Sequence, residues 1–190
     1  MICRIMSVPR LLIHTCCAPC LIAPYYQLKE TGMQITGFWF NPNIHPYTEY
    51  KARFDTLREF CERESIPLIM DYGYLLDDFI RNTAGDIEAR CEYCYRSRLE
   101  PAVMMAKEKG FDYYSSTLLY SRYQKHDLIN SVGEELGLKY GVKWYYQDWR
   151  VLWQKGIDLS KEQGMYRQKY CGCIYSERDR YLGKPKKESI

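Results

Sequence analysis

The sequence predicts an α/β protein in which a five-stranded parallel sheet carries helices on both faces, followed by a C-terminal helical segment. Short apolar runs typical of buried strands alternate five times with longer segments of helical periodicity. Glycines, prolines or polar loops separate these segments. The chain has 190 residues, of which 46% are hydrophobic, so it can build the core of one domain.

The first half of the chain provides three strands, which we place at 11–15, 34–40 and 67–70. Each is a short apolar or alternating run of the length that strands usually have. Two longer helices are expected between them, at 19–29 and 47–63. Thr31-Gly32 closes the first helix, and the second keeps apolar side chains at helical spacing.

The second half repeats the alternation, with strands at 111–119 and 142–146. Helices are expected at 91–109, 126–136 and 176–182, with one or two short helices over 74–89. We interpret residues 1–190 as a single catalytic domain. Its parts are an α/β core at 8–149, a C-terminal segment at 150–183 and a basic tail at 184–190.

Composition sets few limits on partners but argues against a membrane protein. The net charge of +3 permits a nucleic-acid partner without requiring one. No apolar segment approaches the roughly 20 residues that span a bilayer. The first residues also lack the apolar stretch of a signal peptide. We therefore expect a cytoplasmic protein, and we expect it to be a monomer.

Nine cysteines are many for a reducing compartment, where clustered thiols bind metals or perform redox chemistry more often than they form structural disulfides. Cys3 lies near the start of the chain, and Cys61 fits a core position in a helix. The other seven form three groups: Cys16-Cys17-Cys20, Cys91-Cys94 and Cys171-Cys173.

The first cysteine group follows the first strand directly. The carboxyl ends of parallel strands share one edge of the sheet, and open α/β sheets bind ligands there. The same edge is expected to receive the loop with His45, Asp71 after the third strand and Tyr120 after the fourth. These side chains are therefore candidates for one site.

The C-x-x-C of Cys91 and Cys94 is compatible with a redox pair, half a zinc site or half an iron–sulfur site. The adjacent Cys16 and Cys17 favour a bound group larger than a single metal ion, because their side chains diverge. A four-iron cluster offers four separate iron atoms for such ligands. Cys16, Cys17, Cys91 and Cys94 are thus a plausible ligand set for a [4Fe-4S] cluster. Cys20 could replace either of the first two.

The C-x-C of Cys171 and Cys173 can close a small, strained disulfide that is easily reduced. It suits a redox-active dithiol or a further metal-binding pair, although two idle thiols in a loop are the alternative. Asp71 could bind a metal, act as an acid or cap the next segment. His14 and His45 fit packing as well as function.

Basic and aromatic residues alternate around the cysteine groups. Such a pattern suits a polynucleotide whose base is turned out of its stack, although many of these residues could equally form a solvated helix face. The basic residues are Arg96, Arg98, Arg122, Lys125, Arg167, Lys169, Arg178 and Arg180, and the aromatic ones are Tyr95, Tyr120, Tyr123, Tyr166, Tyr170 and Tyr175.

Taken together and in this order, five motifs spread over residues 8–183 resemble those of the cobalamin-independent epoxyqueuosine reductases. They are His-Thr-Cys-Cys-Ala-Pro-Cys at 14–20, Asn-Pro-Asn-Ile-His-Pro at 41–46 with Glu49, Tyr50 and Arg53, Cys-Glu-Tyr-Cys-Tyr-Arg-Ser-Arg-Leu at 91–99, Thr-Leu-Leu-Tyr-Ser at 117–121 with Gln124-Lys125-His126, and Tyr-Cys-Gly-Cys-Ile-Tyr-Ser at 170–176.

This resemblance implies a Rossmann-like fold similar to that of the nucleotide-α-hydrolase-like (HUP-like) tRNA-modifying enzymes. It also implies a reaction, the last step of queuosine biosynthesis. In that step, epoxyqueuosine at the wobble position of tRNA is reduced to queuosine with electrons from a donor that the sequence does not identify.

By the same resemblance, a [4Fe-4S] cluster would be held by Cys16, Cys17, Cys91 and Cys94. Cys171 and Cys173 would form a redox-active disulfide and, with Asp71, would be the catalytic residues. A second metal, a mononuclear iron, could be held by Cys17, Asp71 and Cys171.

Two alternatives remain from the sequence. One is another iron–sulfur-dependent tRNA-modifying enzyme, such as a thiolase that uses ATP, but residues 14–17 lack the glycine-rich phosphate loop that ATP would need. The other is a non-catalytic zinc module that binds RNA. Iron–sulfur absorbance at about 400 nm would exclude a purely zinc site.

Overall fold

The computed structural model describes residues 8–183, so Cys3 and the expected tail at 184–190 lie outside the described residues. Five strands form one sheet in the order β3-β2-β1-β4-β5, and all four pairings are parallel. This confirms the predicted fold class. The strands are β1 (Arg10–His14), β2 (Gln34–Trp39), β3 (Leu68–Met70), β4 (Tyr113–Ser116) and β5 (Lys143–Trp144).

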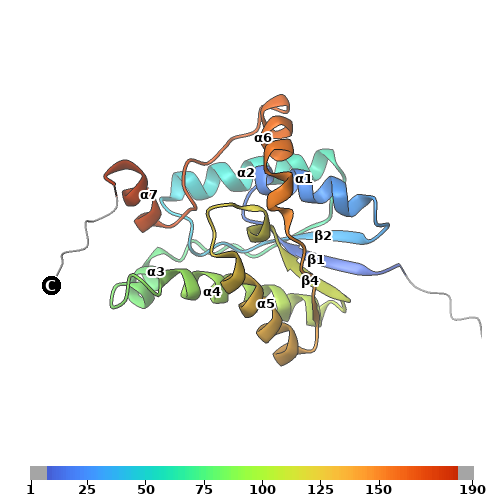
Figure 1. Cartoon of the computed structure of the whole chain (residues 1–190), viewed down its shortest axis with the longest axis horizontal. Helices are drawn as coiled ribbons and strands as arrows, with labels where there is room; N and C mark the ends of the chain where they lie inside the picture. Colours follow the sequence, from blue (N-terminus) through green and yellow to red (C-terminus); the bar gives the residue numbers. More distant parts are fainter. Residues whose placement is uncertain (1–7, 184–190) are drawn as a thin grey trace, which may run out of the picture.

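Helices cover both faces of the sheet (Figure 1). One face carries α1 (Ala18–Lys29), α2 (Tyr47–Arg63) and α6 (Trp153–Glu162), and the other carries α3 (Leu76–Thr83), α4 (Arg90–Glu108) and α5 (His126–Tyr140). The last helix, α7 (Ile174–Tyr181), lies beside the sheet. None of the helices within residues 8–183 is both long and apolar enough to cross a bilayer.

The central strand β1 is buried on both sides, with Leu11, Leu12 and Ile13 each 0% exposed. A continuous apolar run is what a strand covered by helices on both faces requires. The core also includes Cys61, which is 2% exposed, as the helical pattern around it indicates. The core thus fixes the position of β1 and of the residues that follow it.

The strand order reverses at β1. The chain first builds β2 and β3 on one side of β1 and then returns to place β4 on the other side. In open α/β sheets such a reversal marks the usual ligand site, which here falls at the carboxyl ends of β1 and β4. The N–H group of Cys16 donates to Thr117 Oγ1 across this point at 3.1 Å.

The second half of the chain departs from the predicted boundaries. The strand expected at 111–119 ends at Ser116, whose hydroxyl accepts from Leu118 N–H and caps the 3-10 helix η1 (Thr117–Tyr120). The strand expected at 142–146 shortens to β5. A second 3-10 helix, η2 (Trp149–Leu152), leads into α6, which the sequence patterns did not indicate.

The missed helix α6 packs closely on the rest of the molecule through a glycine. A Cβ atom at Gly156 would lie 2.8 Å from Tyr120 Cζ, so only glycine permits this approach. The contact depends on tertiary packing rather than on periodicity, and no pattern within the segment could have predicted it.

Candidate active site

Three cysteines lie together at the start of α1. Cys17 is the N-cap of the helix and Cys20 stands in its first turn, directly after the end of β1. The sulfur atoms of Cys16, Cys17 and Cys20 all lie within 4.8 Å of one another. Each residue is at most 6% exposed. Cys20 therefore joins the other two thiols in one buried triad.

The triad favours a single negative charge, on Cys16. The thiols of Cys17 and Cys20 donate toward Cys16 and, together with the hydroxyl of Thr117, lower the pKa of Cys16. Burial raises the pKa of Cys17, and the hydrogen bond to Cys16 raises that of Cys20. The positive end of the α1 dipole also stabilises a thiolate. Deprotonating all three thiols would require a bound cation.

Gln168, from the segment between α6 and α7, covers the triad. Its Nε2 donates to Cys17 Sγ at 2.9 Å and to Cys20 Sγ at 3.4 Å. No sequence motif points to this residue, because nothing in its local pattern relates it to residues about 150 positions earlier. Gln168 therefore links the end of the chain to its first cysteine group.

A second group of thiols forms around Phe79. Cys94 and Cys173 are buried, and Cys171 packs against them. Burial raises the pKa of Cys94 to about 11. The Cys173 thiol donates toward Cys171 and lowers the Cys171 pKa to about 5. Cys91 is half-buried one helical turn before Cys94.

The grouping of thiols differs from the predicted ligand set. Among residues 8–183, the triad is the one group of His, Cys, Asp or Glu donors whose atoms all lie within 4.8 Å of one another. Cys94 is associated with the C-x-C motif instead. Cys16 and Cys17 belong to both the predicted set and the observed triad, and Cys91 packs against the core cluster that contains the triad without joining its close group of sulfur atoms.

The difference between these two ligand sets can be tested with Cys20→Ala and Cys91→Ala. We expect Cys20→Ala to lose more than half of its iron after anaerobic reconstitution, because a corner of the triad is removed. Iron per protein is the measurement, with Cys61→Ala as the control for loss of a buried thiol. Full iron in Cys20→Ala together with loss in Cys91→Ala would contradict a role for the triad as a unit.

Arg98 is a buried cation beside the second group. It is 1% exposed, and it donates to Cys94 Sγ at 3.1 Å and to Cys94 O at 3.0 Å. No carboxylate within residues 8–183 forms an ion pair with it, although buried guanidinium groups require a negative partner. The partner must be a thiolate or another anionic group. The Arg98 side chain is not part of the accessible surface, so this residue does not belong to the exposed basic residues that could reach the phosphates of a polynucleotide.

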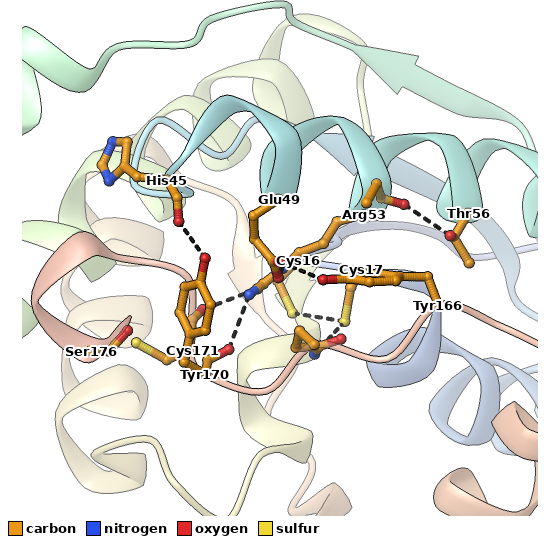
Figure 2. A network of polar contacts seen from close by, with 12 residues as sticks. Cys16, Cys17, His45, Glu49, Arg53, Thr56, Tyr166, Tyr170, Cys171 and Ser176 are labelled. Carbon is orange, nitrogen blue, oxygen red and sulfur yellow. Dashed lines mark hydrogen bonds and ion pairs between the residues drawn. The ribbon is translucent and has the colours of Figure 1, made fainter. Parts of the chain in front are cut away.

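Arg53 ties the C-x-C segment to α2 (Figure 2). It is 1% exposed and pairs with Glu49 at 2.7 Å. Its remaining donors reach the backbone oxygens of Tyr170 at 3.0 Å and Cys171 at 3.1 Å. Tyr166 completes the network by donating to Glu49. The sequence motif contained Glu49 and Arg53, but nothing in it indicated this role.

The loop after β2 forms the other support of the C-x-C segment. His45 N–H donates to Gly172 O at 2.8 Å, and Tyr170 OH donates to His45 O at 2.6 Å. Gly172 has φ +130°, and a Cβ there would stand 3.1 Å from Ile44 Cγ1. A glycine between the two cysteines is therefore required by backbone conformation and by space.

Asp71 and His14 occupy different surroundings. Asp71 is exposed at the end of β3, the edge strand, and its N–H donates to Trp39 O. His14 is buried in β1, with Nδ1 2.8 Å from Ser116 Oγ and Nε2 3.2 Å from Phe40 O. Both ring nitrogens of His14 are thus occupied in holding neighbouring strands together.

The His45 imidazole is 0% exposed, and burial lowers its pKa from 6.5 to about 4. The folded protein keeps the ring neutral, whereas the unfolded chain binds a proton below pH 6.5. Stability should therefore fall as the pH drops from 6.5 and level off below about 4, with up to about 3 kcal/mol lost from this group. The free energy of unfolding, measured with denaturant at several pH values across this range, should depend less steeply on pH in His45→Phe than in the wild type. An unchanged slope would contradict the burial argument.

Several of the basic and aromatic residues flanking the cysteines remain accessible. Arg122, Lys125, Arg167 and Lys169 are exposed, and Tyr123 is 83% exposed. Tyr95 and Tyr120 are buried at 2% and 3%, so they do not belong to this exposed set. The residues that remain outside form a basic surface near η1 and the segment that covers the triad.

The residues present suit a metal–sulfur centre. The triad supplies soft thiolate ligands, which iron–sulfur clusters use. A buried guanidinium without a carboxylate partner supplies positive charge next to the second thiol group. Such a centre would be anionic, and Arg98 would balance part of its charge, whereas the charge of Arg53 is largely offset by Glu49.

Comparison with known proteins gives consistent results. Residues 11–179 match the model of the family described as epoxyqueuosine reductase QueH. The QueH of Dehalococcoides mccartyi is 34% identical over 177 residues, covering 93% of this chain and 97% of that protein. The QueH of Thermotoga maritima is 35% identical over 176 residues, covering 87% and 88%.

Among solved structures, the U34-tRNA thiolase NcsA from Methanococcus maripaludis, determined with its [4Fe-4S] cluster, aligns with a TM-score of 0.61 at 17% identity. The match covers 88% of this chain but 61% of the thiolase, and at this identity it shows a shared fold. The family is shown by the sequence matches, which span nearly the whole chain and confirm the resemblance found in the motifs. This chain belongs to the QueH family of epoxyqueuosine reductases.

Proposed function

We propose that this protein reduces epoxyqueuosine to queuosine at the wobble position of tRNA, the last step of queuosine biosynthesis. The observation that carries this proposal is the family match over residues 11–179, a range that contains all three cysteine groups. The buried thiols at the carboxyl ends of β1 and β4 are consistent with a redox reaction there.

The reaction requires two electrons and two protons. Both C–O bonds of the epoxide break, a C=C bond forms, and the oxygen leaves as water. Oxidation of the Cys171 and Cys173 thiols to a disulfide releases two electrons and two protons, so this pair balances the reaction. An external electron donor, such as a reduced dithiol or a one-electron carrier protein, must then reduce the disulfide before the next turnover.

Cys16 and Cys17 would hold the [4Fe-4S] cluster, with Cys20 as the third ligand that the geometry favours and Cys91 or Cys94 as the fourth. When bound, the cluster supplies electron transfer in single-electron steps. Arg98 would offset part of its negative charge. As the alternative to the dithiol role, Cys171 would bind a second, mononuclear iron together with Cys17 and Asp71, and Asp71 is alternatively the proposed acid.

The substrate proposed is a tRNA, and the exposed cations near the site support this. Arg122, Lys125, Arg167 and Lys169 can contact phosphates, while Tyr123 can stack on an unpaired base. Binding should therefore weaken as salt rises. We place this reaction in the cytoplasm, where the tRNA substrate resides, and we propose that a monomer performs it.

The test uses protein purified without air and a tRNA carrying epoxyqueuosine at the wobble position, with dithionite as the reductant. Nucleosides from the digested tRNA should lose one oxygen atom in mass, and the protein should contain iron and absorb at about 400 nm. Protein with a full iron complement that leaves the epoxide unchanged would refute the proposed reaction. Zinc in place of iron would favour an RNA-binding module instead.

A further inference from the structure

Two buried polar side chains in the loop between β2 and α2 have no hydrogen-bond partner within residues 8–183. They are Asn43, at 1% exposure, and His45, at 0%. Both amide atoms of Asn43 and both ring nitrogens of His45 are buried and unpaired. Buried polar groups in folded proteins nearly always have partners. Two such side chains in one short loop therefore need a partner that residues 8–183 do not supply with good geometry.

These side chains lie beside the proposed reductant. His45 N–H donates to Gly172 O, between Cys171 and Cys173. Asn43 Nδ2 lies 3.3 Å from the position that a Cβ of residue 172 would occupy. The His45 ring is 4.9 Å from the ring of Phe79, which packs on Cys94 and Cys173. The unpaired groups and the second thiol group thus meet around Phe79.

A surface pocket also borders Phe79. This open pocket is lined by Phe40, Pro42, Leu75, Asp78, Phe79, Asn82, Tyr93 and Ser97. Pro42 belongs to the loop that carries Asn43, and Phe79 lines the pocket while its ring lies 4.9 Å from the His45 ring. The aromatic residues that line this pocket suit a flat ring that has been turned out of a nucleic acid.

We propose that Asn43 and His45 are substrate-positioning residues that hydrogen-bond the carbocyclic five-membered ring that bears the epoxide and hydroxyl oxygens. Because an unmodified nucleoside lacks this ring, these contacts distinguish the substrate from it. This inference rests on the proposed function. An amide can both donate and accept, and so can a neutral imidazole. Hydroxyl and epoxide oxygens present the complementary groups and carry no charge, which suits a site where Asn43 and His45 provide none.

The alternative is that the two side chains only stabilise the loop, and protein stability separates the two roles. Leucine at 43 or phenylalanine at 45 has nearly the same size without the unpaired polar atoms. If these atoms serve a ligand, each replacement should raise the melting temperature of the free protein by a few degrees. If they serve the loop, the melting temperature should fall.

The experiment measures the melting temperature and the affinity for two tRNAs that differ only in carrying epoxyqueuosine or guanosine at the wobble position. For Asn43→Leu and His45→Phe we expect a higher melting temperature. We also expect the ratio of the affinity for the epoxyqueuosine tRNA to that for the guanosine tRNA to fall about tenfold. Gln27→Leu is the matched control, because Gln27 Oε1 is also buried and unpaired but lies in the last part of α1. It should raise the melting temperature and leave the ratio unchanged.

The outcomes separate this inference from the function on which it rests. If both variants keep the wild-type ratio, ordered water holds these groups and the inference is wrong. A fall in melting temperature with equal weakening for both tRNAs would assign them a structural role and overturn it as well. If the wild-type protein neither reduces the epoxide nor distinguishes the two tRNAs, the proposed function itself fails.

Discussion

Replacing Cys171 or Cys173 by serine is expected to stop multiple turnover, lowering the steady-state rate at least about a thousandfold, while the iron content stays near that of the wild type. The two thiols supply the electron pair in the proposed balance, and a serine hydroxyl cannot form a disulfide. The measurement is queuosine formed per enzyme over time, together with iron per protein. A change of this size corresponds to about 4 kcal/mol of lost transition-state stabilisation.

Cys61→Ser is the matched control for this prediction. Cys61 is buried in α2 and belongs to neither thiol group. The Cys61→Ser replacement should lower the stability of the protein without changing its turnover rate or its iron content. A Cys171→Ser protein that turns over at the wild-type rate would exclude the C-x-C as the electron source. Loss of most of its iron would instead assign Cys171 to metal binding.

Replacing Arg53 by methionine is expected to destabilise the protein by about 3–5 kcal/mol, because it leaves Glu49 buried without its cation. The variant should also loosen the C-x-C segment, since Arg53 holds the backbone oxygens of Tyr170 and Cys171. Denaturant unfolding measures the first effect. Protease cleavage near residue 170 measures the second.

A double replacement tests the cause of that loss. Arg53→Met with Glu49→Leu removes both charges, so it should recover part of the stability lost in Arg53→Met alone while the segment stays loose. Arg96→Met breaks a partly exposed ion pair with Glu135 and should cost less than about 1 kcal/mol. A loss of similar size in Arg53→Met and Arg96→Met would contradict the importance of burial.

The sequence predicted the sheet and the edge at which the site lies, because both follow from local patterns. The continuous apolar run Leu11-Leu12-Ile13 marks a central strand, and the cysteines that follow it must stand at its carboxyl end. Family motifs then indicated the reaction. These inferences did not depend on which side chains touch across the fold.

The remaining features depend on contacts between distant segments. Gln168 donates to Cys17, and Arg53 reaches Cys171, across more than 100 positions in each case. Arg98 reads as a surface cation in a helix of mixed composition, and only packing shows that it is buried. The spacing of cysteines along the sequence likewise could not predict that Cys94 packs with Cys173 rather than with Cys16.

The cover over the triad has a consequence for how the protein is made. The triad lies at residues 16–20 and Gln168 comes near the end of the chain, so a ribosome delivers the thiols long before their cover. Gln168 can contact Cys17 and Cys20 only once the final segment has been made and has docked. The triad therefore takes on its finished surroundings only in the last stage of folding.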